Sequence, residues 1–124
     1  MKLLIVDDHE QMRREIRLFI GDLVEQITEC SDGVEALAVY AAARPDWVLM
    51  DIVMTGMDGL TATRELKAAH PEARIVILTS YDDAELRTAA QSAGACDYVT
   101  KENLQDVRRI LGSRSDSSEA RVAD

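Results

Sequence analysis

The sequence of 124 residues lacks features that mark several common protein classes. Aromatic residues make up only 4% of the chain, which leaves little material for stacking platforms that hold single-stranded nucleic acid. Acidic residues outnumber basic ones by 23 to 14, so the formal charge is -9, and a negative domain is poorly suited to grip a phosphate backbone. We therefore expect no direct nucleic acid binding by this domain.

Cysteines and long apolar runs are also scarce. The two cysteines, Cys30 and Cys96, are too few for a disulfide framework, so we expect free thiols in a reducing compartment. No apolar run reaches the ~20 residues that a membrane span needs. The start of the chain lacks the apolar region and cleavage site of a signal peptide. These absences predict a cytoplasmic protein without membrane contact.

Short apolar runs alternate with stretches that have helical signals. The runs are residues 3–6, 24–30, 47–50, 73–78 and 96–100. The helical stretches are about 9–23, 33–43, 59–69, 82–93 and a last one from 104. Because the predicted strands have no polar side, the pattern favours an α/β fold in which a parallel sheet carries helices on both faces.

Two finer expectations concern helix burial and domain extent. In the stretch 33–43, Val34, Leu37 and Ala41 recur at helical spacing and are expected to line the inner face. Residues 1–112 form the predicted domain. The serine-rich, polar segment 113–124 is expected to be a disordered tail or a truncated linker.

Residues of related chemistry stand at the carboxyl ends of four predicted strands. Asp7 and Asp8 follow the first run, Asp51 the third, Thr79 ends the fourth and Lys101 follows the fifth. In an open parallel sheet, ligands bind at this edge. Neighbouring carboxylates repel one another, so we expect either a cation that stabilises the cluster or one carboxylate that stays protonated. Hard oxygen ligands of this kind suit Mg²⁺. A carboxylate beside Mg²⁺ and a lysine can attack a phosphoryl group.

Each of these residues also has a purely structural explanation. Either aspartate after the first run could cap the following helix, and Asp51 could be a turn residue. Thr79 could be a plain strand-end threonine, and Lys101 a solvated lysine, although a cation at a helix start opposes the helix dipole. His9 is expected to have a surface or capping role, because a site of hard oxygen ligands does not call for imidazole. The joint pattern at four strand ends nevertheless favours a site.

The same residues carry a resemblance to a known family. Over residues 2–111 the chain resembles the receiver domain of bacterial two-component response regulators. The resemblance rests on the segments LLIVDD, VLMDIVM with MDG after it, IVILTS, the Gly94–Ala95 turn and DYVTK. It implies a flavodoxin-like (βα)5 fold with a five-stranded parallel sheet in the order 2-1-3-4-5, for which a chemotaxis member of the family is a standard example.

The resemblance also implies phosphoryl chemistry. Asp51 would accept a phosphoryl group from a sensor histidine kinase, a phosphotransfer protein or a small phosphodonor. Lys101 would pair with the resulting acyl phosphate, and Thr79 would hydrogen-bond one of its oxygens. Tyr98 would be the switch residue whose inward or outward position reports the modification.

The implied cofactor is Mg²⁺. By the same resemblance, Asp8 and Asp51 would hold the ion together with the backbone carbonyl of Val53. Asp7 would act nearby, partly through water.

The chain departs from the family pattern in two loops. Thr55 stands where the family often has proline, which predicts a more mobile loop. Glu102 follows Lys101 where the family often has proline after a cis peptide bond, so that bond geometry is open, since a cis bond without proline costs ~2.5–4 kcal/mol. Val53 and Tyr81 occupy positions that shape water access, which suggests altered hydrolysis of the phosphoryl group.

The leading functional hypothesis is a phosphorylation-controlled signalling switch. Modification would repack the predicted helix at 82–93, the strand at 96–100 and the last helix for partner binding, and the domain would autodephosphorylate without turning over an external substrate. The effector is unknown, the chain is either a stand-alone regulator or a fragment, and a homodimer that forms on phosphorylation is among the expected partners.

Three alternatives stay open. A pseudo-receiver would bind partners without phosphorylation. The changes at Thr55 and Glu102 keep it open, and the intact set of site residues argues against it: Asp8, Asp51, Thr79 and Lys101. A metal-dependent phosphohydrolase would need a second acid or base near the nucleophile, where this chain has Val53. A flavin-binding module would need a hydroxyl- or glycine-rich phosphate loop after the first strand, which is missing.

Overall fold

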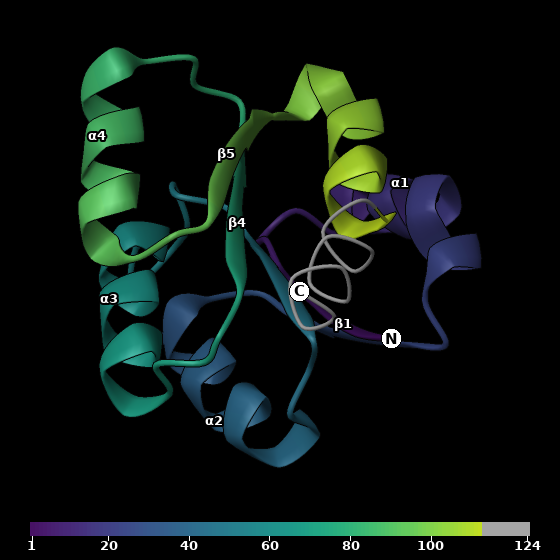
Figure 1. Cartoon of the computed structure of the whole chain (residues 1–124), viewed down its shortest axis with the longest axis horizontal. Coiled ribbons are helices and arrows are strands. Elements are labelled where there is room, and N and C mark those ends of the chain that lie inside the picture. Colours follow the sequence, from purple (N-terminus) through teal and green to yellow (C-terminus); the bar gives the residue numbers. More distant parts are fainter. Residues whose placement is uncertain (113–124) are drawn as a thin grey trace, which may run out of the picture.

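A computed structural model describes residues 1–112 and shows three layers, with helices on both sides of a central sheet (Figure 1). The strands are β1 (Lys2–Val6), β2 (Gln26–Cys30), β3 (Trp47–Met50), β4 (Ile75–Thr79) and β5 (Asp97–Thr100). The helices are α1 (Glu10–Ile20), α2 (Gly33–Ala43), α3 (Gly59–Ala69) and α4 (Ala84–Ala93). A C-terminal helix begins at 104 and includes residues up to 112. The predicted tail 113–124 lies outside the described residues, so the domain boundary at 112 stays a prediction.

The five strands are parallel and lie in the order β2-β1-β3-β4-β5, which confirms the predicted fold. β1 and β3 are neighbours, with Val6 opposite Met50. β4 and β5 end together, with Thr79 opposite Thr100. Because every strand runs the same way, the residues that follow these strands meet at one edge of the sheet.

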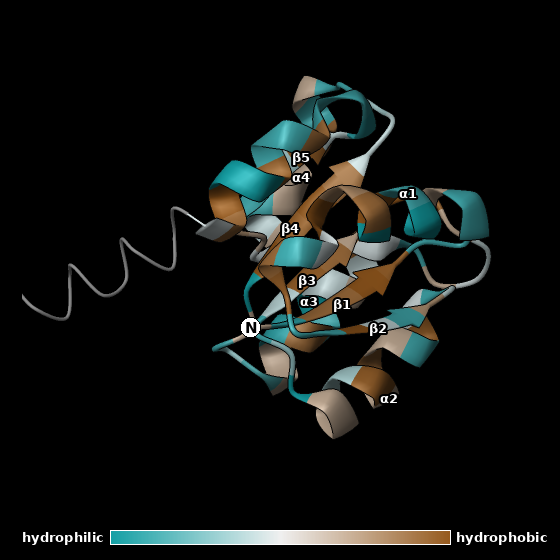
Figure 2. Ribbon diagram, turned by 90° about the vertical axis from the view of Figure 1, so that its right-hand side faces the viewer, coloured by the Kyte–Doolittle hydropathy of each residue, from teal (hydrophilic) through white to brown (hydrophobic). Residues whose placement is uncertain are grey.

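The sheet is buried on both faces, as strands without a polar side require. In β1, Leu4 and Val6 belong to the core under α2, α3 and α4, whereas Leu3 and Ile5 belong to the core under α1 and the C-terminal helix. Successive strand residues point to opposite faces, and this alternation produces the two cores. Figure 2 shows the apolar strands lying between the helices, of which α1 carries many hydrophilic residues whereas α2 is mostly apolar.

The predicted inner face of α2 is wrong in two of its three residues. Val34 is 60% exposed and Ala41 is exposed, while Leu37 is partly buried against the core. The fully buried residues of this helix are Gly33, Ala36 and Tyr40. The segment is apolar nearly all round, so its periodicity cannot select the face that packs on the sheet.

Two further observations concern the end of α1 and the length of the helices. α1 ends at Ile20, and a 3-10 turn (Gly21–Leu23) completes the stretch that was predicted to run to 23. Across residues 1–112, we find no helix with the length and hydrophobicity to cross a bilayer.

Candidate functional site

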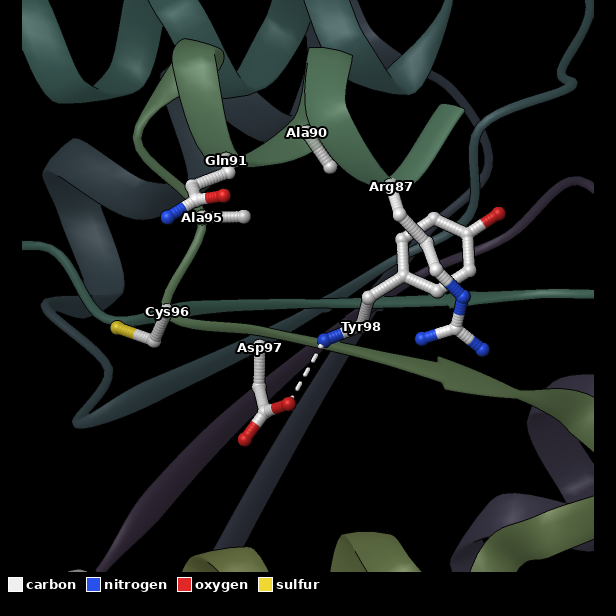
Figure 3. Close-up of a pocket in the computed structure, with 7 residues that line it drawn as sticks. All are labelled: Arg87, Ala90, Gln91, Ala95, Cys96, Asp97 and Tyr98. Atoms are coloured by element: carbon white, nitrogen blue, oxygen red, sulfur yellow. Dashed lines mark hydrogen bonds between the residues drawn. The ribbon is translucent and has the colours of Figure 1, made fainter. Parts of the chain in front are cut away.

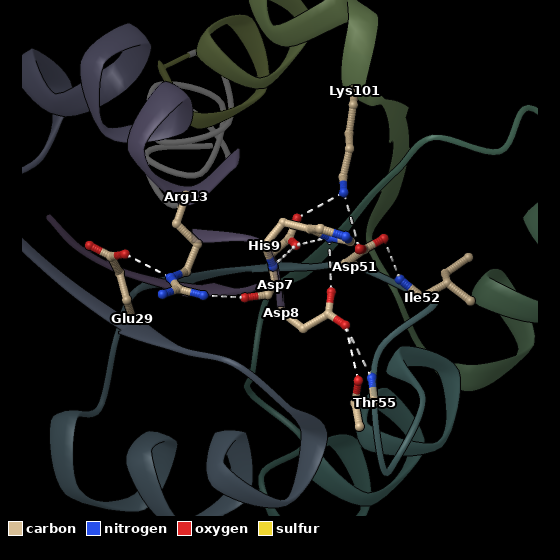
Figure 4. Close-up of polar contacts among 9 residues, drawn as sticks. All are labelled: Asp7, Asp8, His9, Arg13, Glu29, Asp51, Ile52, Thr55 and Lys101. Atoms are coloured by element: carbon tan, nitrogen blue, oxygen red, sulfur yellow. Dashed lines mark hydrogen bonds and ion pairs between the residues drawn. The ribbon is translucent and has the colours of Figure 1, made fainter. Parts of the chain in front are cut away.

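The carboxyl edge of β1 and β3 brings three aspartates together (Figure 4). Asp7 is 2% exposed and Asp51 is 4% exposed, and Asp8 is partly buried between them and solvent. One carboxylate oxygen from each aspartate and one ring nitrogen of His9 all lie within 4.8 Å of one another. The backbone fixes this approach, because the Asp51 N–H donates to the Val6 carbonyl at 3.0 Å. Carboxylates that are distant in the chain therefore face one small volume.

Lys101, which directly follows the edge strand β5, reaches the two buried aspartates. Its Nζ lies 2.8 Å from Asp7 Oδ2 and 3.1 Å from Asp51 Oδ2. The lysine opens a 3-10 turn (Lys101–Asn103) directly after β5, which is why its ammonium reaches the edge. One cation thus bridges two carboxylates that would otherwise be buried without compensation.

Burial and mutual attraction set the charge states of this triad. Burial raises the pKa of Asp51, the positive charge of Lys101 opposes that rise, and the negative charge of Asp7 adds to it. Burial alone would lower the pKa of Lys101, but its hydrogen bonds to the carboxylates and their negative charges raise it. The lysine therefore stays charged while the Asp51 carboxylate is a stronger base than an exposed one.

Each oxygen of Asp51 has one partner. Oδ1 accepts a hydrogen bond from the Ile52 N–H at 2.8 Å, and Oδ2 accepts from Lys101. Both oxygens of this carboxylate are therefore held in place by a donor.

The loop after β3 is tied to Asp8. The Thr55 N–H and hydroxyl lie 3.2 and 3.4 Å from Asp8 Oδ2, and both donate to it. A proline at this position could supply neither donor. The contacts oppose the expectation that a threonine here would loosen the loop. On the same loop, the Val53 side chain is 53% exposed.

Gly59 is a site residue that sequence reasoning missed. A Cβ at this position would lie 1.8 Å from the backbone oxygen of Asp51, and the Gly59 N–H donates to the Ile52 carbonyl at 2.8 Å. The start of α3 therefore packs directly on the backbone that carries Asp51. Asp58 caps α3 by accepting from the N–H groups of Leu60 and Thr61, so this Asp-Gly pair both begins the helix and permits the close approach.

The loop after β1 is held by a second group that the sequence did not indicate. Arg13 donates to the Asp7 carbonyl at 2.6 Å and to Glu29 at 2.9 Å. The N-cap residue of α1 is His9, and its side chain makes no capping hydrogen bond. Helix capping therefore does not explain Asp7 or Asp8.

Thr79 and Tyr98 lie on the β4–β5 side of the edge. Thr79 is fully buried, and among the described residues its hydroxyl has no hydrogen-bond partner. The Tyr98 hydroxyl donates to the Tyr81 carbonyl, and the Arg87 guanidinium stacks on the Tyr98 ring at 4.5 Å (Figure 3). The contact covers one end of a cavity of about 270 Å³ between α4 and β5. The Lys101–Glu102 peptide bond is trans, like every other within residues 1–112.

The residues at the edge fit a hard divalent cation. Three carboxylates supply oxygen ligands within a small volume, and Asp8 Oδ1 is a buried oxygen without a hydrogen-bond partner among the described residues. Mg²⁺ is held in proteins by one or two carboxylates and several waters. The arrangement can thus combine a nucleophilic carboxylate, a fixed ammonium and an ion in one place.

Comparison with known proteins agrees with this geometry. The family model for the response regulator receiver domain matches residues 3–111. Over 118 residues the chain is 39% identical to the uncharacterized transcriptional regulatory protein YhcZ of Bacillus subtilis, covering 90% of this chain and 55% of that protein. Over 100 residues it is 41% identical to the chemotaxis protein CheY of Halobacterium salinarum, covering 81% of this chain and 83% of that protein. The chain spans little more than half the length of the first curated relatives that it matches.

Solved structures match over nearly the whole chain. A LuxR-family two-component response regulator from Aurantimonas sp. SI85-9A1 aligns with a TM-score of 0.80 and 30% identity, covering 98% of this chain and 97% of that chain. The BeF3-activated receiver domain of Klebsiella pneumoniae RstA aligns with a TM-score of 0.80 and 30% identity, covering 90% and 98% of the two chains.

Proposed function

Because the chain belongs to the response regulator receiver domain family, we propose that it is a phosphorylation-controlled switch whose acceptor is Asp51. The observation that carries the proposal is the contact of the Lys101 ammonium with both Asp7 and Asp51, beside the partly buried Asp8. A charged lysine against a carboxylate of raised pKa is the combination that acyl phosphate formation needs.

The reaction itself is a displacement at phosphorus. An oxygen of Asp51 attacks the phosphoryl group, a bond forms between that oxygen and phosphorus, and the bond from phosphorus to the donor's nitrogen or oxygen breaks. Lys101 offsets the charge of the transferring oxygens. The unpartnered Thr79 hydroxyl donates to one of those oxygens once the group is attached.

Asp8, Asp51 and the backbone carbonyl of Val53 would hold Mg²⁺, with Asp7 acting partly through water. The bound ion supplies positive charge against the phosphoryl oxygens. Thr55 keeps one oxygen of Asp8 in place, and Arg13 holds the backbone of Asp7. These contacts orient the ligands before an ion arrives.

The output of the switch is the face made by α4, β5 and the C-terminal helix. Phosphorylation adds negative charge at the edge, Thr79 moves toward it, and Tyr98 moves into the space that Thr79 leaves. The donor would be a histidine kinase or a phosphotransfer protein in the cytoplasm. Since YhcZ is named a transcriptional regulatory protein, the whole protein would act on transcription through a region outside this chain, and a homodimer would form on phosphorylation.

Receiver domains are signalling modules rather than enzymes that turn over external substrates. For this chain, autodephosphorylation is the only hydrolysis that we propose. The loop position of Val53 supplies neither an acid nor a base, and this counts against a phosphohydrolase, which would need a second catalytic group there.

Labelling by a small acyl phosphate tests the proposal. With Mg²⁺, the wild-type chain is expected to gain one phosphoryl group by intact mass, and Asp51→Asn is expected to gain none. Asp82→Asn is the matched control, because Asp82 is 70% exposed and pairs only with Arg87 among the described residues. It should be labelled like the wild type.

Three results would count against the proposal. Equal labelling of Asp51→Asn would reject the acceptor residue. No labelling of the wild type by acyl phosphate or by any histidine kinase would favour the pseudo-receiver. Steady phosphate release from unrelated monoesters would favour the phosphohydrolase.

A further inference from the structure

We infer that His9 adds a nitrogen ligand to the aspartate cluster, so that the site takes first-row transition ions such as Co²⁺, Ni²⁺ and Zn²⁺ as well as Mg²⁺. The inference rests on the metal site of the proposed function and goes beyond its oxygen ligands. It was not expected from the sequence, where a hard-oxygen site gave no reason to include imidazole.

The ring nitrogen lies where a ligand would. His9 Nδ1 is 2.9 Å from Asp8 Oδ1 and 3.3 Å from Asp7 Oδ1, and the cluster with Asp51 spans no more than 4.8 Å (Figure 4). Two ligand atoms that each bond one ion at ~2.1 Å lie roughly 3–3.5 Å apart. The nitrogen and the nearest oxygens therefore have the spacing of ligands that share an ion.

The orientation of the ring supports the same interpretation. The 3.3 Å contact with Asp7 has hydrogen-bond geometry, but the shorter approach to Asp8 Oδ1 does not, and that oxygen has no hydrogen-bond partner among the described residues. The ring is hydrogen-bonded to Asp7 and lies beside Asp8 Oδ1 without a hydrogen bond to it, which leaves that oxygen available to an ion.

His9 can take this role without disturbing the fold. Its side chain is 70% exposed, and it makes no capping hydrogen bond for α1. The ring can therefore turn into or out of the cluster at little cost in packing. Its backbone N–H is held by Asp7 at 2.9 Å, which keeps the residue at the cluster in either case.

The identity of the ion decides what the imidazole does. Mg²⁺ prefers oxygen ligands and retains its waters, so the imidazole contributes no bond when Mg²⁺ occupies the cluster. Co²⁺, Ni²⁺ and Zn²⁺ bind imidazole well, so the ring stays and contributes a bond. Removal of His9 should therefore affect the two classes of ion differently, and for Mg²⁺ it removes a competitor.

The test compares ion binding by the wild type and by His9→Ala without a phosphodonor. Co²⁺ binding is followed by its visible absorption and Mg²⁺ binding by calorimetry, at a pH where imidazole is neutral. We expect His9→Ala to weaken Co²⁺ binding by about tenfold, in line with the loss of a metal partner, and to change the visible spectrum. Binding of Mg²⁺ should be unchanged or tighter.

His70→Ala is the matched control. It removes the only other histidine of the sequence, which contacts Tyr40 and lies 3.7 Å from Glu72, away from the aspartates in the fold. This variant should retain the wild-type Co²⁺ affinity and spectrum of the cluster. If His70→Ala instead removes the Co²⁺ signal, the ion binds elsewhere and the inference fails.

Two other outcomes would overturn it. Equal weakening of Co²⁺ and Mg²⁺ binding in His9→Ala would make His9 an orienting group for Asp8, and unchanged Co²⁺ binding would exclude it as a ligand. Because no phosphodonor is present, these failures leave the labelling of Asp51 untouched. Conversely, if the wild type binds Co²⁺ through His9 but is never labelled, the proposed phosphorylation switch is wrong and the role of His9 as a metal ligand stands.

Discussion

The two halves of the carboxyl edge differ in how their fully buried polar residues are held. At the ends of β1 and β3, Asp7 and Asp51 are buried and share the ammonium of Lys101. At the end of β4, the buried Thr79 hydroxyl has no partner among the described residues, and the next helix is largely exposed. The first half is fixed by paired charges, whereas the second contains a group that can gain a hydrogen bond only if something changes.

Packing follows the same division. α4 has only Ala90 and Ala93 fully buried, while α2 and α3 bury larger side chains such as Tyr40 and Leu66. At ~25 cal/mol per Å² of apolar area, small side chains hold a helix weakly. Chemistry is therefore placed where the fold is rigid, and the element proposed to move is the one that costs least to displace.

The largest expected effect comes from removal of the bridging cation. Lys101→Ala leaves Asp7 and Asp51 buried without a counter-charge, which should lower the free energy of unfolding by about 3 kcal/mol in EDTA. Urea unfolding measures the loss, and added Mg²⁺ should restore part of it by replacing the missing positive charge. Lys2→Ala, an exposed lysine at the opposite end of β1, should change little. Similar losses in both variants would mean that Lys101 does not hold this half together.

A steric change should also break the rigid half. Gly59→Ala places a Cβ against the backbone oxygen of Asp51, so α3 or the end of β3 must shift. We expect a loss of about 2 kcal/mol, as for other overpacked sites, together with slower labelling of Asp51. Gly21→Ala is the control, since no atom lies within 4 Å of its added Cβ. Unfolding and labelling equal to those of the control would place α3 farther from Asp51 than the structure does.

Neutralising the acceptor residue should raise the free energy of unfolding, whereas the two preceding substitutions should lower it. Asp51→Asn removes a buried charge that faces Asp7 while Lys101 keeps its contact with Asp7. Without metal, the free energy of unfolding should rise by about 1 kcal/mol.

The gain should depend on pH in a defined direction. Because the folded-state pKa of Asp51 is raised, the folded protein binds its proton more readily than the unfolded chain does, and wild-type stability from this group falls as pH rises through that pKa. The advantage of Asp51→Asn is therefore full at neutral pH and shrinks as the pH falls through the raised value. Urea titrations of both proteins over acid and neutral pH measure it. A gap that widens toward acid would mean that the pKa is lowered instead.

The contrast between the halves was only partly predictable. The apolar runs mark the strand ends, so the order of the sheet and the shared edge followed from the sequence and the family resemblance. The inner face of α2 did not, because its segment is apolar nearly all round. Other contacts could not be predicted because they join residues that only the folded chain brings together. These are the fit of Gly59 on Asp51, the hydrogen bond from Arg13 to Asp7 and the stacking of Arg87 on Tyr98.

The smallest expected effect tests the half that is free to change. Thr79→Val replaces the unpartnered hydroxyl by a methyl group of similar shape, which should stabilise the unmodified protein by up to about 1 kcal/mol. With the phosphoryl group attached, or with beryllofluoride in its place, the gain should vanish or reverse, because only the hydroxyl can donate to the new oxygens. Thr63→Val is a close control, since Thr63 is also fully buried and its hydroxyl also has no partner among the described residues. It should stabilise both states alike, as measured by urea unfolding. If the two variants respond in the same way, Thr79 is only a strand-end residue. Its unpartnered hydroxyl then has no role in binding the phosphoryl group.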